Sequence, residues 1–119
     1  QQLLHYTSDM EKQSFDNTVY KTGAQRDGRH GKLRLSLVPH EPLKRVMKRY
    51  LDGANTYGEN NWMKGMNYSV YYDSAMRHLF EFWEGRQNED HLAAAVWNIF
   101  ALMQENKNKS LDDRDNFPN

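Results

Sequence analysis

Histidines and carboxylates recur on two segments that otherwise read as apolar helix. Arg77 and His78 lie in the first segment, and Glu89, Asp90 and His91 open the second. Such side chains are costly to bury unless they are paired or bind an ion, so their position among apolar residues indicates a site. Carboxylate oxygens are the ligands that Mg²⁺ and Mn²⁺ prefer. We take Asp90, His91 and Glu89 as candidate metal ligands; the alternative is that the acidic residues only complement the helix dipole.

The spacing of His78 and Glu81 offers a second metal-binding pattern. Three residues apart on a helix, they can present an imidazole and a carboxylate to one ion. The alternative is a solvated helix face, on which Arg77 and Glu81 pair at i,i+4 and stabilise the helix by about 0.3 kcal/mol. We interpret Glu81 as a surface residue and keep His78, which borders the apolar stripe of its helix, as a catalytic candidate.

A row of polar side chains follows one face of the last helical segment. His91, Asn98 and Glu105 are separated by seven residues each, almost two turns, so that they line up. Alanines flank the row and leave room for a close helix or for a ligand. Asn98 is a candidate ligand-binding residue, although its spacing alone favours a core amide that is hydrogen-bonded within the fold.

Two groups of residues fit the parts of a nucleotide. Arg26, Lys32 and Arg34 lie among glycines; arginine matches phosphate oxygens, and glycine lets backbone N–H groups approach them. Tyr57 and Trp62 lie in a glycine-containing loop, where an aromatic ring can stack on a base. Glycine-rich basic loops and aromatic residues are also common without a ligand, and this loop lacks the spacing of a Walker motif.

Length, charge balance and the absence of cysteine exclude several functional classes for this chain. At 119 residues the chain can form one core, and its 16 basic side chains balance 16 acidic ones, which argues against a non-specific nucleic-acid binder. The absence of cysteine excludes disulfides, thiolate zinc sites and cysteine nucleophiles, and suits a reducing compartment. The sequence shows neither a membrane-spanning stretch nor a secretory signal. We expect a cytoplasmic protein with no nucleic-acid and no membrane partner.

Three helices are expected to position these residues, near 41–54, 69–84 and 90–105. Pro42 suits the first turn of the first helix, and Gly53 is expected to end or kink it. Ser69 can cap the second helix, Gly85 follows its end, and Asp90 opens the third. The third helix is apolar nearly all round, which is typical of a central helix.

The N-terminal third shows no helical period. Leu33, Leu35 and Leu37 alternate with polar residues, which predicts a short extended piece. The fold class we predict is mainly α: a small helical bundle of about three core helices with an irregular, partly extended N-terminal third.

Four blocks of sequence stand out: Gly23–Asp27 with Gly31–Pro39, then Gly53–Gly65, Ala75–Leu79 and Asp90–Asn98. Together they resemble the phage-associated dATP/dGTP diphosphohydrolase N-terminal domain family, over about residues 22–104. The resemblance implies a mainly helical domain related to the all-α, MazG-like NTP pyrophosphatases. The chain lacks the EExxE helix and ExxD segment of that larger group, and Ala94 stands where many family members have a second histidine.

The resemblance implies a phage-type purine (deoxy)nucleoside triphosphate diphosphohydrolase. Such an enzyme uses a metal ion to release pyrophosphate and leaves a nucleoside monophosphate. Mg²⁺ or Mn²⁺, held by Asp90 with His91 or His78, would neutralise the phosphate oxygens and orient a water. The alternative is a non-catalytic nucleotide-binding or nucleotide-sequestering regulatory protein, which a pocket with fewer metal ligands than a hydrolase needs would favour.

Residue roles follow from this hypothesis. Glu59, Glu81 or Glu89 would act as the base, and the ligand would be a nucleotide or a nucleotide-like small molecule. The candidate catalytic residues are His78, Asp90, His91 and Glu59. The candidate ligand-binding residues are Arg26, Lys32, Arg34, Tyr57, Asn61, Trp62, Arg77 and Asn98.

The same sequence suggests a domain plan. We expect residues 1–13 to form an N-terminal arm, residues 14–106 a single nucleotide-binding helical domain, and residues 107–119 a mobile, charged tail. A short chain with a largely apolar third helix and exposed aromatic residues needs a partner subunit to cover them, so we predict a homo-oligomer. If the chain is phage-encoded, its compartment is the host cytoplasm.

Overall fold

The computed structural model describes residues 17–118, and the chain forms two compact units, residues 1–38 and residues 39–119. The arm expected over residues 1–13 lies outside the described residues, and the expected domain boundaries stay a prediction. The fold is mainly helical, as predicted.

The described part of the first unit holds a two-stranded hairpin. Strand β1 (Thr18–Val19) pairs antiparallel with β2 (Gln25–Arg26), so that Thr18 stands opposite Arg26. Residues 35–37, expected to be extended, instead form the 3-10 turn η1 (Leu35–Leu37), so this prediction is wrong. The alternating leucines there are exposed, and alternation predicts a strand only where one face is buried.

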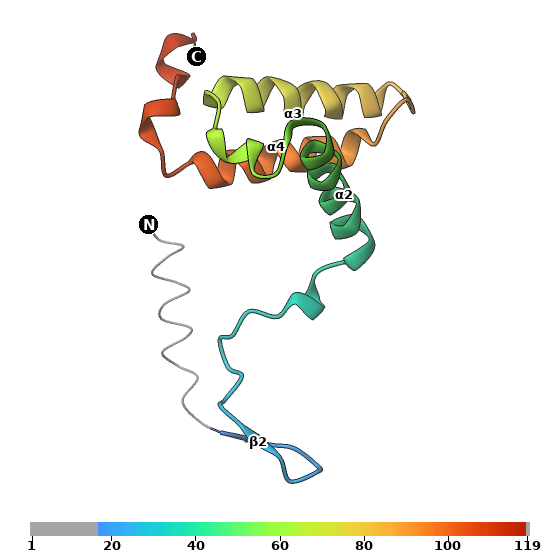
Figure 1. Ribbon diagram of the computed structural model, residues 1–119, viewed down its shortest axis with the longest axis vertical. Coiled ribbons are helices and arrows are strands. Elements are labelled where there is room, and N and C mark those ends of the chain that lie inside the picture. Colours follow the sequence, from blue (N-terminus) through green and yellow to red (C-terminus); the bar gives the residue numbers. More distant parts are fainter. Residues whose placement is uncertain (1–16, 119) are drawn as a thin grey trace. The chain divides into compact units, whose positions relative to one another are not determined.

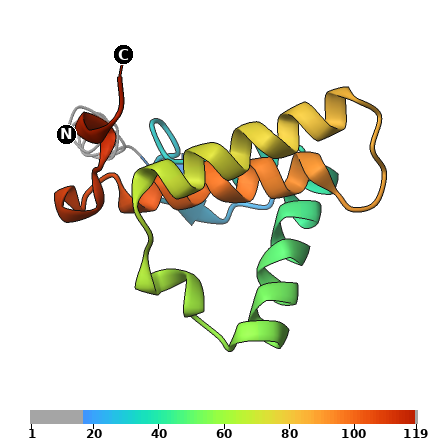
Figure 2. The ribbon, with the colours of Figure 1, turned by 90° about the horizontal axis from the view of Figure 1, so that it is seen from above.

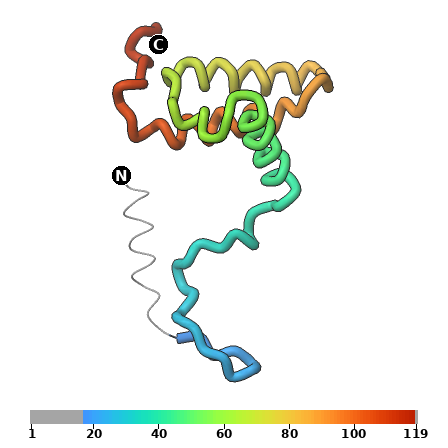
Figure 3. The backbone as a smooth tube through the Cα atoms, viewed as in Figure 1, coloured from blue at the N-terminus to red at the C-terminus, as the bar shows by residue number. Residues whose placement is uncertain are grey.

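Three long helices build the second unit: α2 (His40–Tyr57), α3 (Tyr68–Trp83) and α4 (His91–Glu105). Helices α3 and α4 lie side by side and antiparallel, joined by the short connection of residues 84–90 (Figures 1 and 3). Helix α2 runs across this pair at a steep angle and packs mainly on α4 (Figure 2). The 3-10 turn η2 (Asn61–Lys64) then leads the chain back to the start of α3.

Two of the expected helix boundaries need correction. Gly53 neither ends nor interrupts α2, which continues to Tyr57 and stops where Gly58 adopts a φ of 94°. A single interior glycine costs a helix only about 1 kcal/mol, which the packing of its neighbours offsets. Ser69 is not the cap of α3, because the helix begins at Tyr68 and Asn67 precedes it. Asp90 does cap α4: its side chain accepts the N–H of Ala93 at 3.1 Å.

The core of this unit lies around α4, the helix that was expected to be central. Its alanines are buried and allow α2 and α3 to approach closely, and Tyr71 of α3 is almost completely buried. The hydroxyl of Tyr71 accepts the N–H of Met66 at 3.0 Å. Four polar residues are buried among these apolar side chains: His78, His91, Asn98 and Glu105.

The segment after α4, expected to be a mobile tail, contains two 3-10 turns, η3 (Lys109–Leu111) and η4 (Arg114–Asn116). It contacts the first turn of α3: Asp113 accepts the backbone N–H of Ser69 at 3.0 Å and its hydroxyl at 2.5 Å. The Tyr68 hydroxyl donates to the carbonyl of Glu105 at 2.9 Å. Among the described residues, no helix combines the length and the apolar character needed to cross a membrane.

Candidate functional site

Two buried histidines and a glutamate converge where α3 and α4 approach their connection. Nδ1 of His78 lies 3.0 Å from Nδ1 of His91, and Oε2 of Glu81 lies 3.4 Å from the same His91 atom. One ligand atom from each of the three residues lies within 4.8 Å of the other two. The side chain of Glu81 is 21% exposed, whereas both histidines are almost fully buried. The three side chains form a candidate metal centre.

The fold brings these residues together through a short connection. Gly85, with a φ of 84°, allows the chain to leave α3, and Asp90 starts α4 so that His91 is its first residue. Antiparallel packing of the helices then sets His91 beside the last two turns of α3. His78 and Glu81, three residues apart, share the face of α3 that meets it.

The ring of His91 is held in one tautomer by its other nitrogen. Nε2 of His91 lies 2.9 Å from the amide oxygen of Asn88, which can only accept a hydrogen bond. Nε2 therefore carries the hydrogen in the neutral ring, and Nδ1 presents its lone pair toward Glu81 and His78. Burial lowers the pKa of His78, and the charge of Arg77 lowers it further, so this ring is neutral at neutral pH.

Glu81 divides its two oxygens between two neighbours. Oε1 accepts a hydrogen bond from Arg77 at 3.3 Å, and Oε2 faces His91. The i,i+4 pair of Arg77 and Glu81 expected from the sequence is therefore present. It orients the carboxylate toward the histidines rather than toward solvent.

The two acidic residues before His91 have other partners. Arg45 donates to both carboxylate oxygens of Asp90, at 2.7 and 2.6 Å, and these bonds hold the pKa of Asp90 at about 2. Arg49 pairs with Glu89 at 3.1 Å. Both pairs join α2 to the start of α4. The structure thus brings Asp90 and Glu89 to arginines, and brings Glu81 to the histidines.

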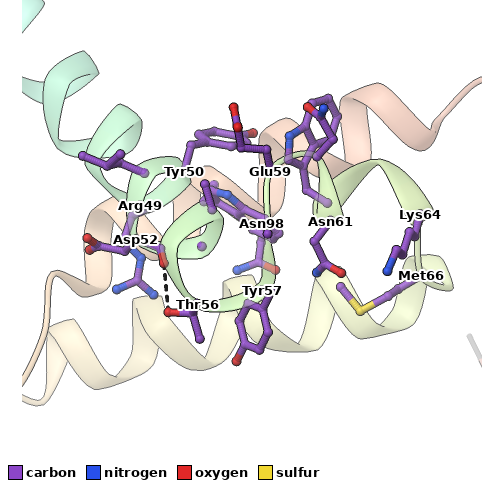
Figure 4. A pocket seen from close by; sticks show the side chains of 18 of the residues that line it. Arg49, Tyr50, Asp52, Thr56, Tyr57, Glu59, Asn61, Lys64, Met66 and Asn98 are labelled. Atoms are coloured by element: carbon purple, nitrogen blue, oxygen red, sulfur yellow. Dashed lines mark hydrogen bonds between the residues drawn. The ribbon is translucent and has the colours of Figure 1, made fainter.

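An open pocket of about 960 Å³ lies between the end of α2, the η2 turn and the α3–α4 pair. This volume is in the range of small-molecule sites. Figure 4 shows Arg49 and Lys64 on opposite sides of Asn98, with Tyr57 in front. Asn98 uses one N–H of its amide on the carbonyl of Ala94 at 2.8 Å, which leaves the rest of the amide for a ligand.

The pocket combines aromatic, amide and charged side chains. Tyr50 packs against Trp62 and Trp97, with ring centroids 6.0 and 5.7 Å apart. Within residues 17–118, Lys64 makes no hydrogen bond and no ion pair, so its ammonium group remains for a ligand. The chemically distinctive lining residues are Arg49, Tyr50, Asp52, Tyr57, Glu59, Asn60, Asn61, Trp62, Lys64, His78, Trp97 and Asn98.

The sequence model of the family described as dATP/dGTP diphosphohydrolase, N-terminal, matches residues 22–114. The chain belongs to this family. The match contains the whole metal-centre candidate and every residue that lines the pocket. No curated protein and no solved structure shows significant similarity to the chain.

Several residues that the sequence singled out in this family member meet at the pocket, and others do not. Six of them line it: Tyr57, Glu59, Asn61, Trp62, His78 and Asn98. Asp90, Glu89, His91 and Arg77 lie outside its lining and act in the contacts described above. Arg26, Lys32 and Arg34 belong to the other unit, and their role in holding phosphate stays a prediction.

Two functional candidates, Arg49 and Lys64, escaped the sequence interpretation, and a third, Glu81, was considered as a metal ligand and as a base but interpreted as a surface residue. Glu81 had a signal, its spacing from His78, but the equally good spacing from Arg77 favoured a surface role. Arg49 gave no signal because it lies on the polar side of an ordinary amphipathic helix. Lys64 follows Trp62 in the loop, and only the turn η2 places it on the pocket wall.

Proposed function

We propose that this protein hydrolyses purine (deoxy)nucleoside triphosphates to nucleoside monophosphates and pyrophosphate, with the nucleotide held in the pocket beside α2. One observation carries the proposal: His78 belongs both to the pocket wall and to the candidate metal centre. A nucleotide in the pocket therefore lies next to groups that can bind a metal ion. Membership of the diphosphohydrolase family agrees with this chemistry.

The pocket offers partners for each part of a nucleotide. Tyr57 is exposed and Trp62 lines the same wall, so either ring can stack on a purine. Asn61 and Asn98 can each donate and accept hydrogen bonds at the base or sugar. Lys64 supplies a positive charge that no other described side chain neutralises, which suits a phosphate group. Arg49 is shared with Glu89 and gives a second positive charge at the far side.

Chemistry at the phosphates needs a charged environment and a base. A divalent ion at the His78–Glu81–His91 cluster would neutralise phosphate oxygens and favour attack by water. Glu59 is the pocket carboxylate best suited to accept the proton from that water, because it is exposed and makes no ion pair among the described residues. The water oxygen would then bond to the α-phosphorus while the bond from that phosphorus to the oxygen bridging the α- and β-phosphates breaks, so that pyrophosphate leaves.

The experiment is incubation of the purified protein with each of the four dNTPs and Mg²⁺ or Mn²⁺, followed by separation of the products. We expect dATP and dGTP to yield monophosphate and pyrophosphate. Glu59→Gln should slow turnover by about 100-fold or more, whereas Glu84→Gln, outside the pocket, should not. Tight binding of intact nucleotide would instead support the regulatory, nucleotide-sequestering alternative.

Assembly into a homo-oligomer is part of the proposal. Large apolar side chains remain exposed along α3 and α4, and a second copy would remove them from water. Light scattering at micromolar concentration should give a mass above the 14.1 kDa of one chain. We place the reaction in the cytoplasm, where dNTPs are formed. The exposed residues are Val70, Tyr72, Met76, Leu79, Phe80, Phe82, Trp83, Ile99, Phe100 and Met103.

A further inference from the structure

We propose that His78, Glu81 and His91 bind one first-row transition-metal ion, such as Zn²⁺, Co²⁺ or Mn²⁺, in preference to Mg²⁺. The proposal deepens the proposed function by naming the ligands and the class of ion. It does not need the nucleotide, so metal binding and hydrolysis can be tested separately.

The distances between the ligand atoms fit a single ion. Ligands at about 2.0–2.2 Å from a metal lie about 3.0 Å apart in octahedral and about 3.4 Å apart in tetrahedral geometry. The structure gives 3.0 Å between the two Nδ1 atoms and 3.4 Å between His91 Nδ1 and Glu81 Oε2. These two separations suit a single ion, and the third pair of ligand atoms, from His78 and Glu81, lies within 4.8 Å.

The surroundings prepare two of the three ligands. Asn88 fixes the tautomer of His91 so that Nδ1 offers its lone pair to the centre. Arg77 holds Oε1 of Glu81 and leaves Oε2 directed at His91. Metal-binding histidines and carboxylates in proteins usually have such supporting hydrogen bonds. Asn88 and Arg77 are therefore positioning residues for the metal ligands.

The chemistry of the donor set selects the class of ion. Two imidazoles and one carboxylate suit zinc, iron, cobalt or manganese, whereas Mg²⁺ prefers oxygen ligands only. Asp90 and Glu89, the oxygen donors first considered, are held by Arg45 and Arg49. Three protein ligands leave at least one position for water or phosphate, as catalytic sites require. His78, which lines the pocket, sets the centre beside the proposed nucleotide.

Titration of the full chain with Co²⁺ tests the assignment without nucleotide. After treatment with a chelator, the protein should bind one Co²⁺ per chain and show the visible absorption of cobalt with nitrogen ligands. Zn²⁺ should displace it, and millimolar Mg²⁺ should not. Glu81→Gln should weaken affinity by about 100-fold or more, whereas Glu84→Gln and Asp90→Asn should leave it within about twofold.

Circular dichroism checks that each variant keeps its helices, and Glu81→Gln is preferred because Glu81 is the least buried ligand. The proposal is overturned if Glu81→Gln keeps the cobalt spectrum and affinity, or if Mg²⁺ competes as well as Zn²⁺. If Co²⁺ binds as expected but no dNTP is cleaved, the metal centre stands and the proposed hydrolysis fails.

Discussion

Arg45 holds Asp90 through both carboxylate oxygens, its Nε to Oδ2 at 2.7 Å and its Nη2 to Oδ1 at 2.6 Å. The two residues are 45 positions apart in sequence, and their contact joins the first half of α2 to the cap of α4. Because Asp90 also accepts the N–H of Ala93, one carboxylate starts α4 and anchors α2 to it. The pocket lies between these helices, so this contact supports its walls.

The contribution of Asp90 to stability should depend on pH. Its pKa is about 2 in the folded protein, against 3.8 for an unperturbed aspartate, so its stabilising effect is present above pH 3.8 and is lost as the pH falls toward 2. Asp90→Asn keeps a good helix cap and removes the charge. We expect it to lower the free energy of unfolding by about 1 kcal/mol at pH 6, a value reduced by screening because Asp90 is 34% exposed.

Urea unfolding of wild type and Asp90→Asn at several pH values measures this difference. The gap between the two proteins should close near pH 2. Glu41→Gln, which removes an exposed i,i+3 pair with Lys44, is the control and should have little effect at any pH. A gap that stays constant from pH 6 to pH 2 would contradict the assignment.

Asn88 is not a metal ligand, but it should change the metal affinity of the centre through its hydrogen bond to His91. Asn88→Ala removes the acceptor for Nε2 of His91, so the ring is free to carry its hydrogen on Nδ1, where it blocks metal binding. We expect Co²⁺ affinity to fall by about 10- to 100-fold with little change in helical content. Gln87→Ala, one residue away and exposed, is the matched control. Equal affinity of the two variants would show that the tautomer is not set by Asn88.

Lys64 should contribute to nucleotide binding through phosphate alone. Loss of one charge-assisted hydrogen bond costs about 1.5–3 kcal/mol, so Lys64→Ala should weaken dATP binding by about 10- to 100-fold. Deoxyadenosine, which has no phosphate, should bind both proteins equally. Lys48→Ala is the control, because Lys48 pairs with Asp52 and does not line the pocket. Calorimetry with both ligands at two salt concentrations separates these outcomes.

Two glycines with nearly the same backbone should respond differently to alanine. Gly58 has φ and ψ of 94° and 152°, and Gly65 has 77° and 157°, a region that costs other residues about 1–3 kcal/mol. A Cβ on Gly65 would lie 2.8 Å from Cδ1 of Leu111 and 3.3 Å from the side chain of Glu105. A Cβ on Gly58 would have no neighbouring atom within 4 Å among the described residues. Gly65→Ala should therefore destabilise the protein by about 1 kcal/mol more than Gly58→Ala.

Thermal or urea unfolding of this glycine pair is the measurement. Equal losses would mean that Leu111 moves aside at no cost. A larger loss for Gly65→Ala would show that the turn η3 is packed against the loop before α3 in solution.

The three long helices could be predicted from the sequence because their apolar spacing is regular and their ends carry local signals. Asp90 as the cap of α4 is one such signal, and the structure confirms it. Gly53 misled the interpretation because the cost of one glycine is small beside the packing of a whole helix. The prediction of an extended segment at residues 35–37 failed because alternation of apolar and polar residues does not show whether a partner strand is present.

The candidate site was harder to predict, since it depends on contacts between helices. His78 and His91 were recognised by residue type, and the short connection explains why they meet. The sequence did not show which carboxylate lies beside the histidines, because Asp90 and Glu81 are both acidic residues near them in the chain. Only the packing of α2 brings Arg45 to Asp90 and leaves Glu81 beside the histidines. Lys64 depends in the same way on the position of η2.

The contacts of Asp113 with Ser69 bear on how far this chain can be shortened from its C-terminal end and still fold. A chain cut after Glu105 would keep all three long helices, yet the N–H and hydroxyl of Ser69 would lose their acceptor. Leu111, which packs beside Gly65, would go as well. The residues after α4 thus hold the start of α3 in place, and we expect the smallest stable version of this unit to extend beyond Asp113 and not to stop at the end of the last long helix.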